Sequence, residues 1–317
     1  MTVDASASAF TSQRGRILVI RGGAVGDFIV TLPVLAALRS QFPQTRLEVL
    51  AYPQVASLAV RAGLAHEAHA IESRPLAGFF ARKGVLDPQE SERFSRCDVI
   101  LSYLYDPDGI FRENLARVTR AQIIQGPHRP AETSGVPASV QLLEPLERLA
   151  IFDADPVPRL RWPGMGGGPE RWIALHPGSG SVSKNWPLER WMELVGRCVA
   201  ETDWNWMLTG GEAETDALDR LERLIPPARR RVLRGHSLES VAEHLSRCRG
   251  FLGHDSGITH LAAAVGIPCL ALWGPSNESI WRPMAQPGQR IQTRSHPGGL
   301  ADLSIDDVWA SLNSLLS

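Results

Sequence analysis

Apolar and polar positions recur along the chain with two different periods, and the changes between them predict an α/β protein. Residues 16–20, RILVI, form a short apolar run rich in β-branched side chains, which is typical of a buried strand. Apolar side chains then recur at helical spacing from Phe28 to Leu38. Pro33 lies inside this stretch, so it either kinks the helix or marks a start just upstream, with Thr31 as the cap.

The same alternation continues through the first half of the chain. Further strands are predicted at 47–51, 97–103 and 121–125, with helical segments such as 54–62 between them. This order is typical of a parallel, doubly wound sheet. A stretch rich in proline and glycine follows at 153–170 and shows little periodicity, so it is the best candidate for a linker.

After this stretch the alternation begins again. Strands predicted at 172–176, 204–211, 250–255 and 268–274 are separated by helices, and a last helix is predicted at 304–316. The second half is therefore another Rossmann-like unit. The predicted parts are a disordered tail at 1–15, an N-terminal domain at 16–155, a linker at 156–170 and a C-terminal domain at 171–317. The last helix is expected either on its own domain or on the N-terminal one.

The composition fits two ordinary globular domains. At 317 residues the chain exceeds the usual range of roughly 100 to 200 residues per domain, so two cores are expected. Lys and Arg number 33 against 34 Asp and Glu, which gives no reason to expect a nucleic-acid partner. The four cysteines form no CxxC pair, which argues against a zinc site. No apolar run is long enough to span a membrane, and attachment to a membrane surface stays open.

The turn RGGAVGDF, which follows the first predicted strand, is the first candidate ligand site. In a dinucleotide fingerprint Gly23 and Gly26 would fit the last two glycines, but Arg21 occupies the first position. No acidic residue ends the next strand to bind a ribose, which disfavours a nicotinamide cofactor. The glycines, Gly22 included, serve either close packing or close approach of a substrate. Asp27 is either a helix cap or a chemically active carboxylate.

The loop HPGSGSVSKNWP follows the first strand of the second half. It contains small residues, among them Gly178 and Ser179, and one cation, Lys184, just before a helix. Such a loop can offer backbone N–H groups and an ammonium group to phosphate oxygens. The alternative is a flexible surface loop with a solvated lysine.

The segment GHDSGITH is a second candidate anion site. A strand ends at Asp255, and Ser256 and Gly257 then open a helix with almost no large side chains in its first turn. The exposed N–H groups and the positive end of the helix dipole would bind a diphosphate. His260 follows one turn along. Asp255 as a simple cap and His260 as a packed histidine are the alternatives.

Two glutamates, Glu212 and Glu214, follow the strand WNWMLT. A carboxylate there can accept hydrogen bonds from ribose hydroxyls, or it can merely complement the dipole of the next helix. Because the carboxyl ends of parallel strands meet at one edge of a sheet, the loops after His176 and Gly210 should converge with the anion-binding helix. The second half is therefore predicted to hold a nucleotide diphosphate, and the turn around Asp27 is predicted to face it.

Three blocks occur together and in this order: RILVIRGGAVGDFIVTLPVLAALRSQFP, HPGSGSVSKNWPLERWMELV and GHDSGITHLAAAVGIPCLALWGPS. As a set they resemble glycosyltransferase family 9, whose best-known members transfer heptose from ADP-heptose to the inner core of lipopolysaccharide. The resemblance implies a GT-B fold, in which two Rossmann-like, doubly wound domains face each other across a cleft. It also implies an acceptor on the N-terminal domain, a nucleotide sugar on the C-terminal one, and transfer with inversion that needs no metal or other cofactor.

The resemblance implies roles for individual residues. Asp27 matches the general base, and Lys184 matches the lysine that binds phosphate. Glu214 matches the ribose carboxylate, with Glu212 as the alternative. The other positions expected on the nucleotide-sugar side are Gly178, Ser179, Asp255, Ser256, Gly257 and His260, and those of the acceptor-side turn are Gly22, Gly23 and Gly26.

The expected function is an inverting glycosyltransferase that moves heptose from ADP-heptose to a lipopolysaccharide-core-type or other glycan acceptor. A glycolipid acceptor would imply a cytoplasmic enzyme in peripheral contact with the inner membrane. One alternative is another GT-B enzyme, either a transferase with a different nucleotide sugar or a 2-epimerase, and another is a non-catalytic nucleotide-sugar-binding protein. Asp27 discriminates between transfer and mere binding, because a binding module needs no base. The sequence gives no indication of the oligomeric state.

Overall fold

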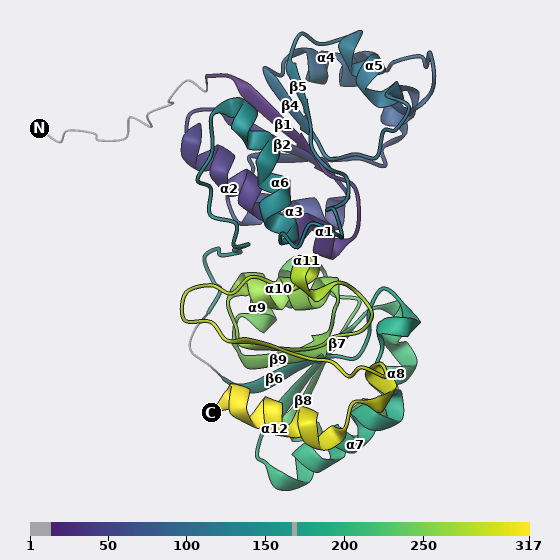
Figure 1. Cartoon of the computed structure of the whole chain (residues 1–317), viewed down its shortest axis with the longest axis vertical. Coiled ribbons are helices and arrows are strands. Elements are labelled where there is room, and N and C mark those ends of the chain that lie inside the picture. The colour runs from purple at the N-terminus through teal and green to yellow at the C-terminus, as the bar shows by residue number, and fades with distance from the viewer. Residues whose placement is uncertain (1–13, 167–169) are drawn as a thin grey trace, which may run out of the picture.

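A computed structural model describes residues 14–166 and 170–317, which form two α/β units placed one above the other in Figure 1. Each unit is built on one sheet of parallel strands with helices packed against it. The two doubly wound sheets predicted from the alternation are thereby confirmed. Residues 1–13 of the predicted tail, and 167–169 of the predicted linker, lie outside the described residues. Within the described ranges, no helix combines the length and the apolar character that crossing a membrane requires.

The first sheet has the strand order β3-β2-β1-β4-β5, and each neighbouring pair runs parallel. Its strands are β1 (Arg16–Ile20), β2 (Arg46–Ala51), β3 (Glu67–Ala70), β4 (Val99–Ser102) and β5 (Gln122–Gln125). The helical segments of this unit are α1 (Val25–Ile29), α2 (Leu32–Gln41), α3 (Pro53–Arg61), η1 (Arg74–Phe80), α4 (Pro88–Ser95), α5 (Ile110–Ala116), α6 (Ala138–Leu143) and η2 (Glu144–Leu149).

The second sheet has the order β11-β10-β9-β6-β7-β8 and is again parallel. Its strands are β6 (Glu170–His176), β7 (Asn205–Gly210), β8 (Arg230–Arg234), β9 (Cys248–His254), β10 (Cys269–Leu272) and β11 (Ile291–Arg294). The α-helices of this unit are α7 (Leu188–Glu201), α8 (Thr215–Leu224), α9 (Leu238–Leu245), α10 (Gly257–Val265), α11 (Glu278–Trp281) and α12 (Ile305–Leu316). Its short 3₁₀ turns are η3 (Val182–Lys184), η4 (Glu212–Glu214), η5 (Pro227–Arg229) and η6 (Leu300–Asp302).

Three strands, β3, β8 and β11, are missing from the sequence prediction. All three lie at sheet edges, where one side of the strand has no partner strand and polar side chains are common. Their sequences, EAHA, RRVLR and IQTR, accordingly lack the apolar runs of the central strands. The missed elements are those that burial constrains least.

The predicted helix after β1 is divided into α1 and α2. Thr31 stands at the start of α2 and Pro33 lies in its first turn, so the second of the two alternatives for Pro33 is confirmed. The Thr31 hydroxyl does not cap α2, because it donates to the carbonyl oxygen of Asp27 at 2.8 Å. The short helix α1 thereby becomes a separate element at the end of β1.

The two units touch along helices, and their apolar cores are continuous. Helix α1 contacts α10, and α3 contacts α9 (Figure 1). One cluster of buried apolar side chains extends from Val19 of β1 to Phe251 of β9. The last helix, α12, packs on the second sheet through Val308 and Leu312. It therefore belongs to its own domain, and the alternative, packing on the N-terminal domain, is wrong.

Candidate active site

The carboxyl ends of the two sheets meet where α1 contacts α10. The backbones come close because glycines line both sides of this contact. A Cβ atom on Gly257 would lie 2.6 Å from Cβ of Val25 and 3.0 Å from the backbone N of Gly26. A Cβ atom on Gly26 would lie 3.4 Å from Cδ2 of His260. The structure thus brings the turn around Asp27 and the start of α10 together.

Asp27 stands in the first turn of α1, and its carboxylate is held by the backbone at Oδ2. Oδ2 accepts a hydrogen bond from the backbone N–H of Ala24 at 2.9 Å. The side chain is 26% exposed, so part of the carboxylate remains accessible to a substrate. Gly23, with φ of +101°, makes room for this carboxylate, since a Cβ there would lie 2.7 Å from Oδ2. Asp27 therefore stabilises its own turn and is also available for proton transfer.

Arg21 is a buried cation beside Asp27 that the sequence analysis did not assign to the site. Its side chain is 1% exposed, and Nη2 lies 3.3 Å from Oδ1 of Asp27. Nε donates to the Asp27 carbonyl oxygen at 3.2 Å and Nη1 to the carbonyl oxygen of His128 at 2.9 Å. Burial lowers the pKa of Arg21, while the Asp27 charge opposes this, and a guanidinium keeps its proton in proteins. The sequence feature that could have identified Arg21 as a site residue is its position as a charged residue directly after a buried strand.

Lys184 and Asp255 form an ion pair on the opposite side. Nζ of Lys184 lies 2.6 Å from Oδ2 of Asp255, and the hydroxyl of Ser276 donates to the same oxygen. The Asp255 side chain is 7% exposed, whereas that of Lys184 is 30% exposed. Asp255 is therefore a fixed carboxylate that holds the lysine at the edge of the sheet, more than the simple cap that was the alternative.

The start of α10 combines a cap with a buried imidazole. Ser256 is the N-cap, and its hydroxyl accepts a weak hydrogen bond from the backbone N–H of Thr259 at 3.3 Å. His260 is buried one turn along. Burial lowers its pKa, whereas the charges of Asp255 and Asp27 act in the opposite direction. His260 is therefore neutral near pH 7 and lies within the electrostatic influence of both carboxylates.

Two other histidines fix the loop that carries Lys184. Nε2 of His254 accepts from the backbone N–H of Trp186 at 2.7 Å, which leaves Nδ1 to donate to the carbonyl oxygen of Gly178 at 3.2 Å. Nδ1 of His176 lies 2.8 Å from the carbonyl oxygen of Thr209. Of these two histidines the sequence analysis noted only His176, as a strand end, because the partners of both come from other loops.

The carboxylate of Glu214 lies over the loop, and Glu212 lies away from it. Oε2 of Glu214 accepts from the N–H of Gly211 at 2.8 Å, and a Cβ on Gly178 would lie 2.2 Å from Oε1. Gly178 is thus required by the close approach of Glu214. Glu212 is exposed in η4. Of the two glutamates, Glu214 is therefore the one that packs against the loop at Gly178.

Ser179 shapes the loop from within. Its hydroxyl lies 2.7 Å from the carbonyl oxygen of Ser181 and 2.7 Å from Oδ1 of Asn185. These contacts tie both ends of the segment that leads to Lys184. The loop is therefore better ordered than the solvated surface loop that was the alternative.

A hollow of about 510 Å³ opens beside Arg21 at the carboxyl edge of the first sheet. Tyr105, Arg112 and His128 line it, and the rings of Tyr105 and His128 lie 4.6 Å apart. Because the His128 carbonyl oxygen accepts from Arg21, this hollow is connected directly to the residue that holds Asp27. The exposed ring of Tyr105 and the guanidinium group of Arg112, which line the same hollow, are suited to a polar, ring-shaped ligand.

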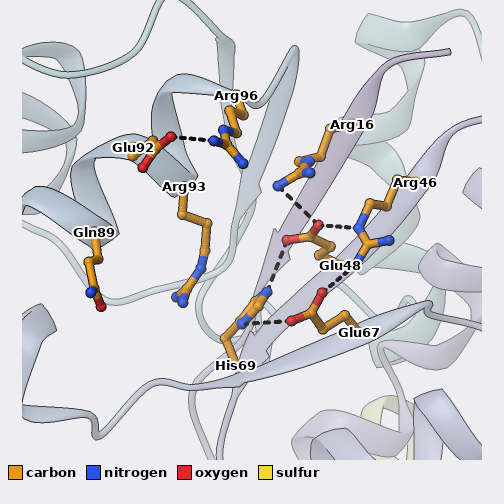
Figure 2. A pocket seen from close by; sticks show the side chains of 9 residues that line it. All are labelled: Arg16, Arg46, Glu48, Glu67, His69, Gln89, Glu92, Arg93 and Arg96. Carbon is orange, nitrogen blue, oxygen red and sulfur yellow. Dashed lines mark hydrogen bonds and ion pairs between the residues drawn. The ribbon is translucent and has the colours of Figure 1, made fainter. Parts of the chain in front are cut away.

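A second polar hollow, of about 350 Å³, lies at the opposite, amino edge of that sheet (Figure 2). Glu48 is buried there, with Oε1 2.7 Å from Nε of Arg46 and Oε2 2.9 Å from Nε2 of His69. Burial raises the pKa of Glu48, but the bonds from His69 and Arg46 outweigh burial and bring it to about 2. Glu48, Glu67 and His69 lie close enough to share a cation, yet Arg46 already pairs with both carboxylates. This cluster joins β1, β2 and β3 and is remote from Asp27.

Comparison with known proteins shows similarity to one family and to one fold. The model of glycosyltransferase family 9 (heptosyltransferase) matches residues 153–301. The chain is 35% identical to lipopolysaccharide heptosyltransferase 1 of Pseudomonas aeruginosa over 133 residues, which are 42% of this chain and 33% of that protein. It is 24% identical over 334 aligned positions to a putative glycosyltransferase of Haemophilus influenzae, covering 94% of this chain and 96% of the relative.

A solved structure extends the similarity over both domains. The chain resembles the E. coli heptosyltransferase WaaC, solved with ADP, at a TM-score of 0.70 and 18% identity, covering 95% of this chain and 99% of that one. At this identity the likeness shows the fold. The predicted GT-B architecture is confirmed.

Proposed function

The chain carries a glycosyltransferase family 9 domain over residues 153–301, and on this premise we propose that it transfers a sugar from a nucleotide diphosphate to a glycan hydroxyl. The single observation that carries this proposal is the meeting of two half-sites at the contact of α1 and α10. Asp27, a carboxylate suited to take a proton, comes from one domain. Lys184 and the start of α10, both suited to an anion, come from the other.

The donor is proposed to be ADP-heptose, and the acceptor a lipopolysaccharide-core-type glycan. Support comes from a relative named lipopolysaccharide heptosyltransferase 1 and from a structural neighbour solved with ADP. The nucleotide diphosphate would lie along the start of α10, with the ribose near Glu214 and the phosphates near Lys184. The acceptor would enter through the hollow beside Arg21. Such an enzyme would act in the cytoplasm.

Transfer is proposed as a single displacement with inversion. Asp27 takes the proton of the acceptor hydroxyl as its oxygen forms the new bond to the anomeric carbon, a step that contributes about 10²- to 10⁴-fold. The bond from that carbon to the diphosphate breaks, and the electron pair stays on the phosphate oxygen. Lys184 and the N–H groups of α10 stabilise this charge, so no metal ion is required. Arg21 holds the Asp27 carboxylate in place by its bonds to both the side chain and the main chain.

Asp27→Asn tests the assignment of the base. Asparagine has the same shape and can still accept from Ala24, but it cannot take up a proton at neutral pH. We expect the transfer rate to fall at least ~10²-fold while ADP affinity stays within about twofold. Steady-state transfer and calorimetric titration with ADP measure the two quantities, and thermal unfolding shows that the variant is folded. Normal turnover would disprove the role of Asp27.

Calorimetry with ADP, UDP and GDP tests the donor separately. We expect ADP to bind most tightly, and tighter binding of UDP or GDP would overturn the ADP-heptose assignment. Tight binding of ADP without transfer to any acceptor tested would instead favour a non-catalytic binding protein.

A further inference from the structure

The loop 126–137, which leads from β5 to α6 in the first domain, bonds to the second domain. The carbonyl oxygen of Glu132 accepts from Nδ2 of Asn277 at 2.7 Å, and its side-chain Oε1 accepts from Nε1 of Trp281 at 2.8 Å. Asn277 is the N-cap of α11 and Trp281 is its last residue, and α11 lies on the side of the second domain that faces the first (Figure 1). Glu132 is therefore bonded to both ends of this short helix.

The same loop also holds Arg21, nearer to its start. Nη1 of Arg21 donates to the carbonyl oxygen of His128 at 2.9 Å, whereas Nε and Nη2 contact Asp27. Of the hydrogen bonds that this side chain forms within the described residues, the one to His128 leads outside its own turn. The orientation of the buried guanidinium, and with it the carboxylate of Asp27, therefore depends on where the loop places this carbonyl group.

The loop is stiff between His128 and Glu132. Pro130 is buried there, and its ring fixes its own φ. The side chain of Gln141, which is 5% exposed, closes the loop from α6. Its Oε1 accepts from the N–H of Ala131 at 2.6 Å, and its Nε2 donates to other groups of the loop. A loop bonded to itself in this way moves as one piece, so a shift at Glu132 reaches His128.

The path from Glu132 through His128 to Arg21 joins the contact between the domains to the carboxylate of Asp27. While α11 lies against the first domain, the loop is bonded at Glu132 and the His128 carbonyl group receives Arg21. Separation of the domains would break both bonds at Glu132 and remove the support that α11 gives to the loop. The placement of Asp27 is then complete only while the second domain is in position.

We propose that Glu132 is a positioning residue, which aligns Asp27 through His128 and Arg21 when α11 of the second domain lies against the first. The consequence for catalysis rests on the proposed function, since it requires Asp27 to act as the base. The mechanical link itself does not, because it can be measured without any substrate. Such a link would orient the base for proton transfer only when the leaving group is held opposite.

Amide hydrogen exchange of the full-length protein, followed by NMR, tests the link. The N–H of Ala24 donates to Oδ2 of Asp27, so its exchange rate reports on the carboxylate. We expect Glu132→Ala, which removes the acceptor for Trp281, to speed exchange about fivefold both in loop 126–137 and at Ala24, the factor that corresponds to about one hydrogen bond. Trp281→Phe, which removes the donor from the other domain, should have the same effect.

Glu132→Gln is the conservative variant and should exchange like the wild type, because its amide oxygen can still accept from Trp281. Thr133→Ala removes an exposed side chain from the same loop and should change neither segment. The double variant of Glu132→Ala and Trp281→Phe should exchange no faster than either single variant, since both remove the same bond. Faster exchange confined to loop 126–137, with Ala24 unchanged, would overturn the proposal, as would wild-type exchange throughout Glu132→Ala.

Transfer in a single turnover gives a second measurement. We expect Glu132→Ala to lower the rate about fivefold, and Glu132→Gln to retain it. ADP affinity in calorimetry should stay within about twofold, because the groups proposed to hold the diphosphate are unchanged. A wild type without transfer would defeat the proposed function, while the exchange rates would still decide on Glu132. An active wild type and an equally fast Glu132→Ala variant would defeat the positioning role alone.

Discussion

His254 connects the end of β9 to the loop before α7, and its protonation should govern stability at acid pH. Burial lowers the pKa of its imidazole from 6.5 to about 4, although the hydrogen bond to Gly178 opposes this shift. A group with a lower pKa in the folded state favours folding fully only above its unfolded pKa. As the pH falls from about 6.5 to about 4, the unfolded chain takes up the proton first, and up to about 3 kcal/mol of stability is lost.

His254→Gln should therefore make stability less dependent on pH. Glutamine can still donate to Gly178 and accept from Trp186, but it has no proton to gain. Urea unfolding at about pH 7 and about pH 5 measures the difference, and the wild type should lose roughly 2 kcal/mol more than the variant. Equal losses in the two proteins would contradict the burial of a neutral imidazole.

Glu214 and Glu212 make a matched pair for the ribose site. The Glu214 carboxylate lies against Gly178 and Gly211, whereas Glu212 points to solvent. A hydrogen bond to a charged group is worth about 1.5 to 3 kcal/mol, so Glu214→Gln should weaken ADP binding by at least about tenfold. Glu212→Gln should leave it unchanged. The reverse result in calorimetry would assign the ribose to Glu212.

At the scale of elements, the contact of α1 with α10 has no room for another carbon atom. We expect Gly257→Ala to push the helices apart, because its Cβ would lie 2.6 Å from Val25, and to reduce transfer strongly. Gly26→Ala should have a smaller effect, since the nearest atom to its Cβ would be 3.4 Å away. Rates of transfer and ADP affinity measure both variants. A stronger effect at Gly26 would mean that the helices do not approach in this way.

The strands show which parts of the fold can be predicted from the sequence. Central strands such as β1 and β10 are confirmed because burial on both faces leaves a continuous apolar run. Edge strands such as β3 and β8 carry no such run and are missed. The candidate site likewise has a part that the sequence predicts and a part that it does not. The turns before α1 and α10 follow from local glycine patterns, but the bond from Arg21 to His128 joins residues 107 positions apart, so no local pattern contains it.

At the scale of the whole molecule, Glu243 of α9 ties three parts together. Its Oε1 accepts from Arg61 of α3 at 2.9 Å and from Nε1 of Trp162 at 3.0 Å. The predicted linker is thus bound to both domains at one point. Two residues before Trp162, the backbone N–H of Leu160 donates to the carbonyl oxygen of Ala264 at 2.9 Å.

Glu243→Gln should loosen the arrangement of the domains without unfolding either of them. Because exposed ion pairs contribute little, the free energy of unfolding should change by less than about 1 kcal/mol. Small-angle scattering without ligand should nevertheless show a larger radius of gyration than the wild type. Glu239→Gln, on the same helix, is the control and should scatter like the wild type. An identical scattering curve for Glu243→Gln would show that this tie does not limit domain opening.

The glycine contact between α1 and α10 also sets an order of events in time. Since the two backbones already touch, a nucleotide sugar cannot pass between them while they are together. For the proposed transfer, the donor has to arrive before the helices meet, and the nucleotide diphosphate has to wait until they part. Each catalytic cycle would then contain one opening and one closing of the molecule, and the speed limit of the enzyme would be set by a movement of whole domains through the solvent, which a more viscous medium slows.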